Sequence, residues 1–72
     1  MRPVAERLVN SLKEERTRLS LTQAELAEHV GVSRKTVNTV ENGVFIPSTL
    51  LALKLARTLG QSVEALFRIE DR

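Results

Sequence analysis

The sequence predicts an all-α fold, in which five helices pack as a compact bundle in one domain, residues 1–72. Apolar residues recur at helical spacing, and no segment shows the sustained alternation of a strand. Residue types that begin and end helices also recur along the chain. With 42% apolar and 28% charged residues, the composition is typical of a folded domain. So short a chain has room for one hydrophobic core, within residues 4–68.

The first helix is expected to begin near Pro3, a residue favoured in the first turn, and to run to about Leu19. Its apolar stripe comprises Ala5, Leu8, Val9, Leu12 and Leu19. Arg16 interrupts this stripe. Because a guanidinium on the apolar side of a helix is costly unless a carboxylate meets it, the sequence predicts a buried or half-buried acidic partner elsewhere.

The second helix is expected to begin at Gln23. Thr22 and Glu25 have the spacing of a capping box, in which each side chain accepts the backbone N–H of the other residue. Gly31 is expected to end the helix, because glycine adopts the left-handed conformation at little cost. The connection to the next helix is therefore short.

Ser33 can cap a third helix from Arg34 to about Asn42, where Asn42-Gly43 ends it. Its inward side holds Thr36, Val37 and Val40. The opposite face combines two cations with hydrogen-bonding side chains: Arg34, Lys35, Asn38, Thr39 and Asn42. Such a face could read bases in a DNA major groove, where Arg and Lys suit guanine and Asn suits adenine. The alternative is an ordinary solvated helix face.

Two further helices are expected. Ser48 caps a fourth helix that runs to Leu59 and is stopped by Gly60, and Ser62 caps a short fifth helix over residues 63–68. The fourth helix is expected to turn inward Leu51, Ala52, Leu53, Leu55, Ala56 and Leu59.

The second and third helices carry small, turn-forming and apolar residues at the spacing of a helix-turn-helix motif. Ala27 is small enough for the helices to approach, Gly31 turns the chain, and Val37 and Val40 hold the third helix on the second. The motifs are Leu21-Thr22-Gln23-Ala24-Glu25-Leu26-Ala27, Gly31-Val32-Ser33 and Val40-Glu41-Asn42-Gly43. Through them the chain resembles, over roughly residues 8–67, the repressor/Cro class of helix-turn-helix proteins, the xenobiotic-response-element family.

The resemblance implies a fold of the phage-repressor DNA-binding-domain type, with the helix-turn-helix at residues 23–42. It implies that the third helix enters the major groove and that the protein binds a near-palindromic operator as a dimer. Gln23 and Asn42 would then hold phosphates. The expected DNA-binding set is Thr22, Gln23, Ser33, Arg34, Lys35, Thr36, Asn38, Thr39 and Asn42. The resemblance also suggests Glu41 as the partner of Arg16 in a structural salt bridge.

The chain departs from the family pattern at two places. Ser20 stands where glycine is common before the second helix, so the turn after the first helix could be built differently. Apolar residues also follow Gly43, where a lysine is common. Their excess suggests a dimer interface, because monomers seldom expose large apolar patches, although a role in completing the core is the alternative for Phe67. The expected interface is Val44, Phe45, Ile46, Leu50, Leu66, Phe67 and Ile69.

These features predict a sequence-specific regulator of transcription that binds double-stranded DNA, a repressor acting as a homodimer. The alternative is an antitoxin or other protein-interaction module whose main partner is a toxin or co-regulator. The net charge of +2 is too small to distinguish DNA binding from protein binding, so the prediction depends on where the charges lie. Without cysteine, with one histidine and without a catalytic constellation, the chain is not expected to be an enzyme or to bind a metal or cofactor. No signal or membrane-spanning run is visible, so we expect a cytoplasmic protein.

Overall fold

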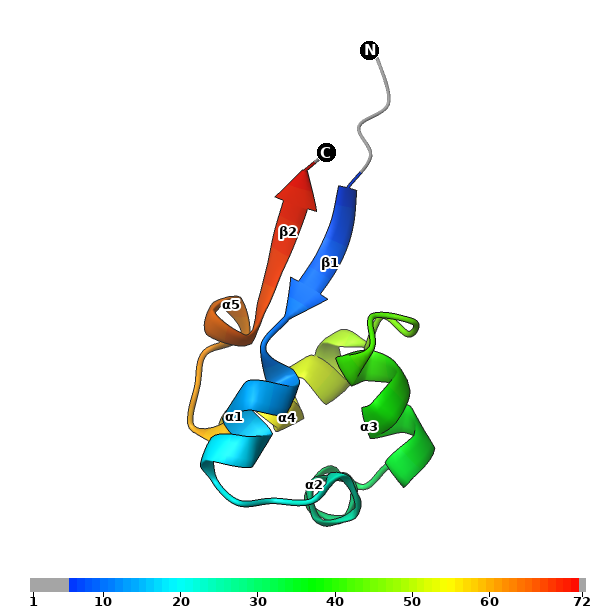
Figure 1. Cartoon of the computed structure of the whole chain (residues 1–72), viewed down its shortest axis with the longest axis vertical. Coiled ribbons are helices and arrows are strands. Elements are labelled where there is room, and N and C mark those ends of the chain that lie inside the picture. Colours follow the sequence, from blue (N-terminus) through cyan, green and yellow to red (C-terminus); the bar gives the residue numbers. More distant parts are fainter. Residues whose placement is uncertain (1–5, 72) are drawn as a thin grey trace.

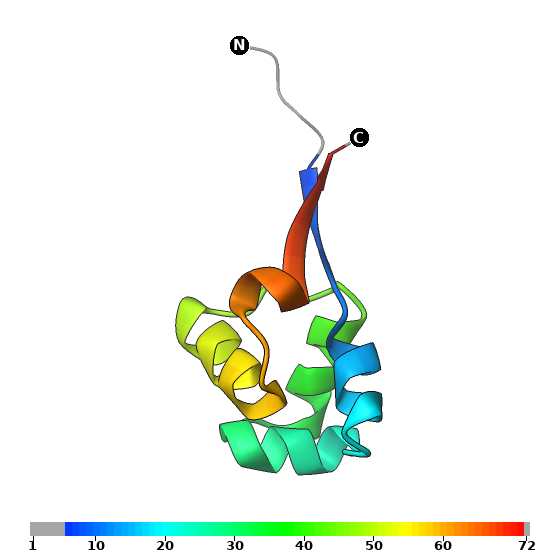
Figure 2. The ribbon, with the colours of Figure 1, turned by 90° about the vertical axis from the view of Figure 1, so that its left-hand side faces the viewer.

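The computed structural model describes residues 6–71. In chain order the elements are β1 (Glu6–Asn10), α1 (Leu12–Arg18), α2 (Gln23–Val30), α3 (Arg34–Glu41), α4 (Thr49–Leu59), α5 (Val63–Leu66) and β2 (Phe67–Asp71). The five helices form a body at one end, and the two strands project from it as a narrow ribbon (Figure 1). Turned by 90°, the ribbon is seen from its side and rises away from the helices (Figure 2). The fold is therefore mostly helical, with a small antiparallel sheet.

The sheet corrects the expectation of an all-α fold. Residues 6–10 form β1 rather than the start of a long first helix, while Pro3 and Ala5 lie outside the described residues. Leu8 pairs with Ile69, and Val9 pairs with Arg68. Two adjacent apolar residues fit one side of a helix as well as they fit a strand, so the local pattern could not distinguish the two. The partner strand, whose paired residues are 57 to 65 positions away along the chain, decides the conformation.

The fifth helix is shorter than expected. It ends at Leu66, because Phe67 already has extended dihedral angles (φ −125°, ψ 138°) and continues into β2. Leu66 and Phe67 are 1% and 8% exposed, so both belong to the core of the protomer. Their predicted place in a dimer interface is therefore wrong.

The other helix boundaries agree with the expected caps. Ser33, Ser48 and Ser62 each accept the backbone N–H of the residue three positions on. Thr22 and Glu25 form the reciprocal capping box. The backbone N–H of Thr22, together with its hydroxyl group, lowers the pKa of the Glu25 carboxyl below its ordinary value. The start of α2 is thus a well-formed N-terminus.

The core lies between the helices and under the base of the ribbon. Its buried residues are Leu12, Leu26, Ala27, Val30, Val37, Val40, Leu51, Leu55, Ala56, Leu59, Leu66 and Phe67. Leu53, expected on the inward side of α4, is exposed instead. Each helix contributes at least one buried residue, so no helix depends on its own propensity alone.

Asn10 joins three elements at the base of the ribbon. Its amide nitrogen donates to the carbonyl oxygen of Val40 at the end of α3, and its amide oxygen accepts the backbone N–H of Leu12, both at 3.0 Å. The residue therefore ties the end of β1 to the start of α1 and to α3. The sequence did not indicate this role, because both β1 and the contact with α3 depend on long-range packing.

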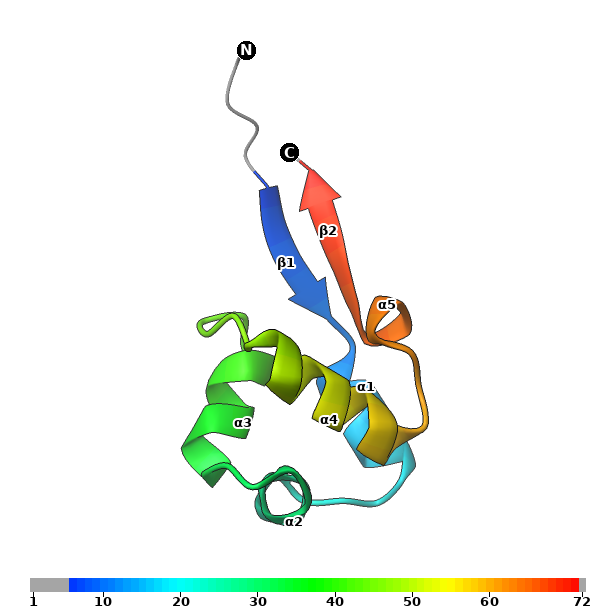
Figure 3. The same ribbon diagram turned by 180° about the vertical axis from the view of Figure 1, so that it is seen from behind.

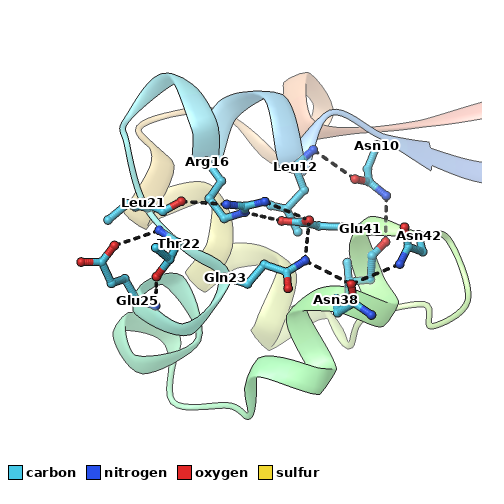
Figure 4. A network of polar contacts seen from close by, with 11 residues as sticks. Asn10, Leu12, Arg16, Leu21, Thr22, Gln23, Glu25, Asn38, Glu41 and Asn42 are labelled. Carbon is cyan, nitrogen blue, oxygen red and sulfur yellow. Dashed lines mark hydrogen bonds and ion pairs between the residues drawn. The ribbon is translucent and has the colours of Figure 1, made fainter.

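The ion pair expected between Arg16 and Glu41 is present, and both side chains are largely buried. Arg16 Nε lies 2.6 Å from Glu41 Oε2, and Arg16 Nη2 lies 3.3 Å from Oε1 (Figure 4). The side chains are 12% and 2% exposed, respectively. Arg16 Nη1 also donates to the carbonyl oxygen of Leu21 at 2.8 Å. One guanidinium therefore fixes α1, the segment before α2 and the last turn of α3 to one another.

Ser20 adopts the left-handed conformation that a glycine would favour, with φ at 58°. The turn is closed by hydrogen bonds from the Ser20 N–H to the Thr17 carbonyl and from the Leu21 N–H to the Arg16 carbonyl. The left-handed conformation costs a non-glycine residue about 1–2 kcal/mol. The turn thus keeps a glycine-like geometry in spite of the serine, and the surrounding contacts hold it there.

We predict that Arg16→Ala lowers the free energy of unfolding by about 3–5 kcal/mol, because it leaves the Glu41 carboxylate buried without its counter-charge. Arg18→Ala is the matched control. Arg18 pairs with Glu15 at 2.9 Å, but its side chain is 52% exposed, so the same change should cost about 0–1 kcal/mol. Urea unfolding of both variants measures the difference. Equal stability of Arg16→Ala and the unchanged protein would contradict a structural role for the buried pair.

Candidate nucleic-acid interface

α2, the turn at residues 31–33 and α3 form a closely packed pair of helices. Gly31 has the left-handed conformation, with φ at 75°, and the N–H of Val32 returns to the carbonyl of Ala27 at 3.0 Å. Ala27 of α2 and Val37 and Val40 of α3 are buried in the hydrophobic core. Seen from both sides, α3 lies at the edge of the body rather than inside it (Figures 1 and 3). One face of α3 is therefore held by the core and the other is open.

The open face of α3 is polar and positively charged. Arg34, Lys35, Asn38 and Asn42 are exposed. Neither Arg34 nor Lys35 forms an ion pair with any other residue within 6–71. The acid of the helix, Glu41, is turned inward and neutralised by Arg16. The helix thus presents two cations to solvent with no exposed carboxylate beside them, which favours an anionic partner.

The hydroxyl groups of the expected DNA-binding set are engaged within the protein. Ser33 Oγ accepts the N–H of Thr36 at 3.1 Å and lies 3.0 Å from the Thr36 hydroxyl. Thr39 Oγ1 donates to the Thr36 carbonyl, and Thr22 Oγ1 accepts the N–H of Glu25, both at 3.0 Å. Thr36 and Thr39 are half-buried. These four hydroxyl groups therefore make hydrogen bonds within the protein. Arg34 and Lys35, in contrast, are exposed.

Three amide side chains of the set meet in one network. Gln23 Nε2 donates to Glu41 Oε1 at 3.0 Å and to Asn38 Oδ1 at 3.1 Å (Figure 4). Asn42 Nδ2 donates to the same oxygen of Asn38 at 3.3 Å. The sequence suggested each amide singly and missed the connection between them. The signal available was the i, i+3 and i, i+4 spacing of Glu41 and Asn42 from Asn38, which places all three on one side of α3.

A second exposed feature, the apolar surface, comprises the five expected interface residues that the core does not bury: Val44, Phe45, Ile46, Leu50 and Ile69. Phe45 and Leu50 line one shallow groove. Phe45, Ile46 and Leu8 line another, and Leu8 is the strand partner of Ile69. The apolar surface therefore continues from the start of α4, across the α3–α4 loop, to the ribbon.

Residues 6–71 offer neither a metal site nor a membrane span. This part of the chain contains no group of three or more acidic or histidine side chains arranged to hold a metal ion. None of its helices has the length and apolar character needed to cross a membrane.

Known proteins are similar to this chain in sequence and in fold. A family model described as helix-turn-helix matches residues 12–66. The chain is 42% identical over 62 residues to YgzD of Bacillus subtilis, covering 86% of this chain and 94% of that protein. It is 44% identical over 62 residues, with the same coverage, to MJ0272 of Methanocaldococcus jannaschii. Both relatives bear the name uncharacterized HTH-type transcriptional regulator.

Solved structures agree with these relatives. The restriction-modification controller protein C.AhdI from Aeromonas hydrophila superposes with a TM-score of 0.71 at 37% identity, over 75% of this chain and 82% of that chain. A protein from Bacteroides fragilis, 24% identical, superposes with a TM-score of 0.76 over 85% of this chain and 98% of its own, which supports the fold alone. By sequence and by fold, the chain belongs to the repressor/Cro-type helix-turn-helix family, a family of DNA-binding transcriptional regulators and not of enzymes.

Proposed function

We propose that this protein is a transcriptional repressor that binds a specific, near-palindromic operator in double-stranded DNA as a homodimer. The observation that carries the proposal is the open face of α3, where Arg34 and Lys35 stand free of carboxylates on a helix fixed to the core. The proposal also places the protein in the cytoplasm, because its ligand is DNA. No reaction, metal or cofactor is part of this function.

Arg34 and Lys35 would read bases from the first turn of α3. Both are long enough to reach base edges in the major groove, and arginine can bind guanine O6 and N7 with two hydrogen bonds. Gln23, at the start of α2, and Asn42, at the end of α3, would hold phosphates. The N-terminus of α2 favours an anion, and the amide NH2 group of Asn42 can donate to a phosphate oxygen. Phosphate contacts of this kind position the protein, whereas base contacts select the sequence.

A homodimer suits both the size of the protomer and its apolar surface. α3 has eight residues, so one protomer covers one half-site. A two-fold dimer would place two such helices about 34 Å apart, one turn of DNA. The apolar surface begins directly after α3 and is exposed in the protomer, with Ile46 at 71% and Val44 at 77%. Covering it between two copies would remove apolar side chains from water.

The same apolar surface supports a second candidate function, an antitoxin or other protein-interaction module. In that case a second protein, a toxin or co-regulator, would cover Phe45 and Ile46, and DNA binding would be secondary. Co-purification with a different small protein, together with weak and non-selective DNA binding, would favour this function over the repressor.

The first test is selection of bound duplexes from a random pool. We expect enrichment of one near-palindromic sequence, whose binding weakens steeply as salt rises, by about 0.9 in log K per phosphate contact for each unit of log salt. Arg34→Ala and Lys35→Ala should each cost about 1–3 kcal/mol on the enriched duplex and relax selectivity at one base pair. Arg57→Ala, which removes an exposed cation from α4, is the matched control and should change selectivity little. Absence of any enriched sequence would refute the proposal.

The second test concerns the dimer. We expect the unchanged protein to sediment as a dimer at micromolar concentration, and Ile46→Ser to shift it to monomer with little loss of thermal stability, because Ile46 is exposed in the protomer. Leu19→Ser is the control, since Leu19 is partly exposed but lies outside the apolar surface. A stable monomer before any substitution would count against the homodimer.

A further inference from the structure

In the polar network of Glu41, Gln23, Asn38 and Asn42, the choice of donor and acceptor at each contact follows from Glu41. Its carboxylate faces the Arg16 guanidinium at 2.6 Å and 3.3 Å, and Oε1 also faces the Gln23 amide at 3.0 Å. An ionised carboxylate can only accept hydrogen bonds. The end of the Gln23 amide that faces it must therefore be the NH2 group.

The Gln23 amide in turn determines the orientation of the Asn38 amide. The Gln23 amide nitrogen carries two hydrogens, of which one goes to Glu41 and the other points at Asn38, 3.1 Å away. The atom of Asn38 that receives it must be an acceptor, so it is Oδ1. Asn42 Nδ2 donates to this oxygen as well, at 3.3 Å. Turning the Asn38 amide over would oppose its NH2 group to the Gln23 donor, whose orientation Glu41 fixes.

We infer that Asn38 is a specificity-determining residue that presents only N–H donors to DNA, and that Gln23 is the positioning residue that holds it so. Asn38 is exposed, and its Nδ2 has no hydrogen-bond partner within the part of the chain from 6 to 71. The inference rests on the proposed function, because it presumes that the open face of α3 meets base edges.

A donor-only amide reads a defined subset of major-groove atoms. It can bind O6 or N7 of guanine, N7 of adenine and O4 of thymine. It is unable to bind the amino groups of adenine or cytosine. The two-bond contact by which asparagine recognises adenine requires a free amide oxygen, and here that oxygen is occupied. For Asn38, the inference therefore excludes the two-bond contact with adenine that the residue type alone would suggest.

Asn38→Asp tests this polarity. The substitution keeps an oxygen for Gln23 and Asn42 and replaces the outward NH2 by an oxygen that only accepts. With the duplex enriched from the random pool and its single-base-pair variants, we expect the preference at one pair to change from an acceptor edge to an amino edge, by about tenfold. A general loss of affinity from the added charge would affect all duplexes equally and leave this change visible. Asn38→Ala is the control and should lose the preference without reversing it.

Gln23→Met tests the positioning role. Methionine has a similar volume but no hydrogen-bonding amide, so Asn38 would be free to turn over. We expect contacts with the amino groups of adenine and cytosine to become acceptable at the same base pair. The melting temperature should fall as well, because the buried Glu41 carboxylate loses one hydrogen bond. A role that is merely structural would instead weaken binding to every duplex alike, and that outcome would overturn the positioning role.

A measurement on the free protein separates this inference from the proposed function. In NMR hydrogen-exchange spectra we expect the side-chain amide protons of Gln23 to exchange more slowly with water than those of Asn38. The reverse order would overturn the inference even if a duplex is enriched, as would identical base preferences in Asn38→Asp and Asn38→Ala. Failure to enrich any duplex would instead overturn the proposed function, and the base reading by Asn38 with it.

Discussion

The buried ion pair between Arg16 and Glu41 is the contact on which the rest of the arrangement depends. It joins α1 to the last turn of α3, and it also holds the segment before α2 through the Leu21 carbonyl. Removing two charges from water is costly, so such a pair is stable only when further hydrogen bonds satisfy it. Leu21 on one side and Gln23 on the other supply them. The pair thereby fixes the position of α3 relative to the body.

The same pair determines what α3 presents to solvent. An eight-residue helix is unstable alone, and α3 is held by the Ser33 cap, by Val37 and Val40 in the core, and by Glu41 at its end. With Glu41 turned inward and neutralised, the outward face has cations without exposed acids. A modest net charge of +2 is therefore compatible with a strongly directional electrostatic surface. The placement of charge, rather than its sum, supports the proposed DNA binding.

The parts of the structure that the sequence predicted are those with local causes. Caps at Ser33, Ser48 and Ser62 depend on residues three positions apart, so they were readable directly. Arg16 was recognised as needing an acid from its position on an apolar stripe, and the family resemblance supplied Glu41. The strands were missed because residues 6–10 become extended only when residues 67–71 lie beside them. The contact between Gln23 and Asn38 was missed for the same reason, since it joins two helices.

The proposed function requires that the open face of α3 meets DNA. The most direct measurement is an NMR titration of isotope-labelled protein with its enriched duplex. We expect the largest shifts on residues 34–42 and on the first turn of α2, with little change in α4 and α5. Largest shifts on α5 or on the outer face of α4, with α3 unchanged, would contradict it.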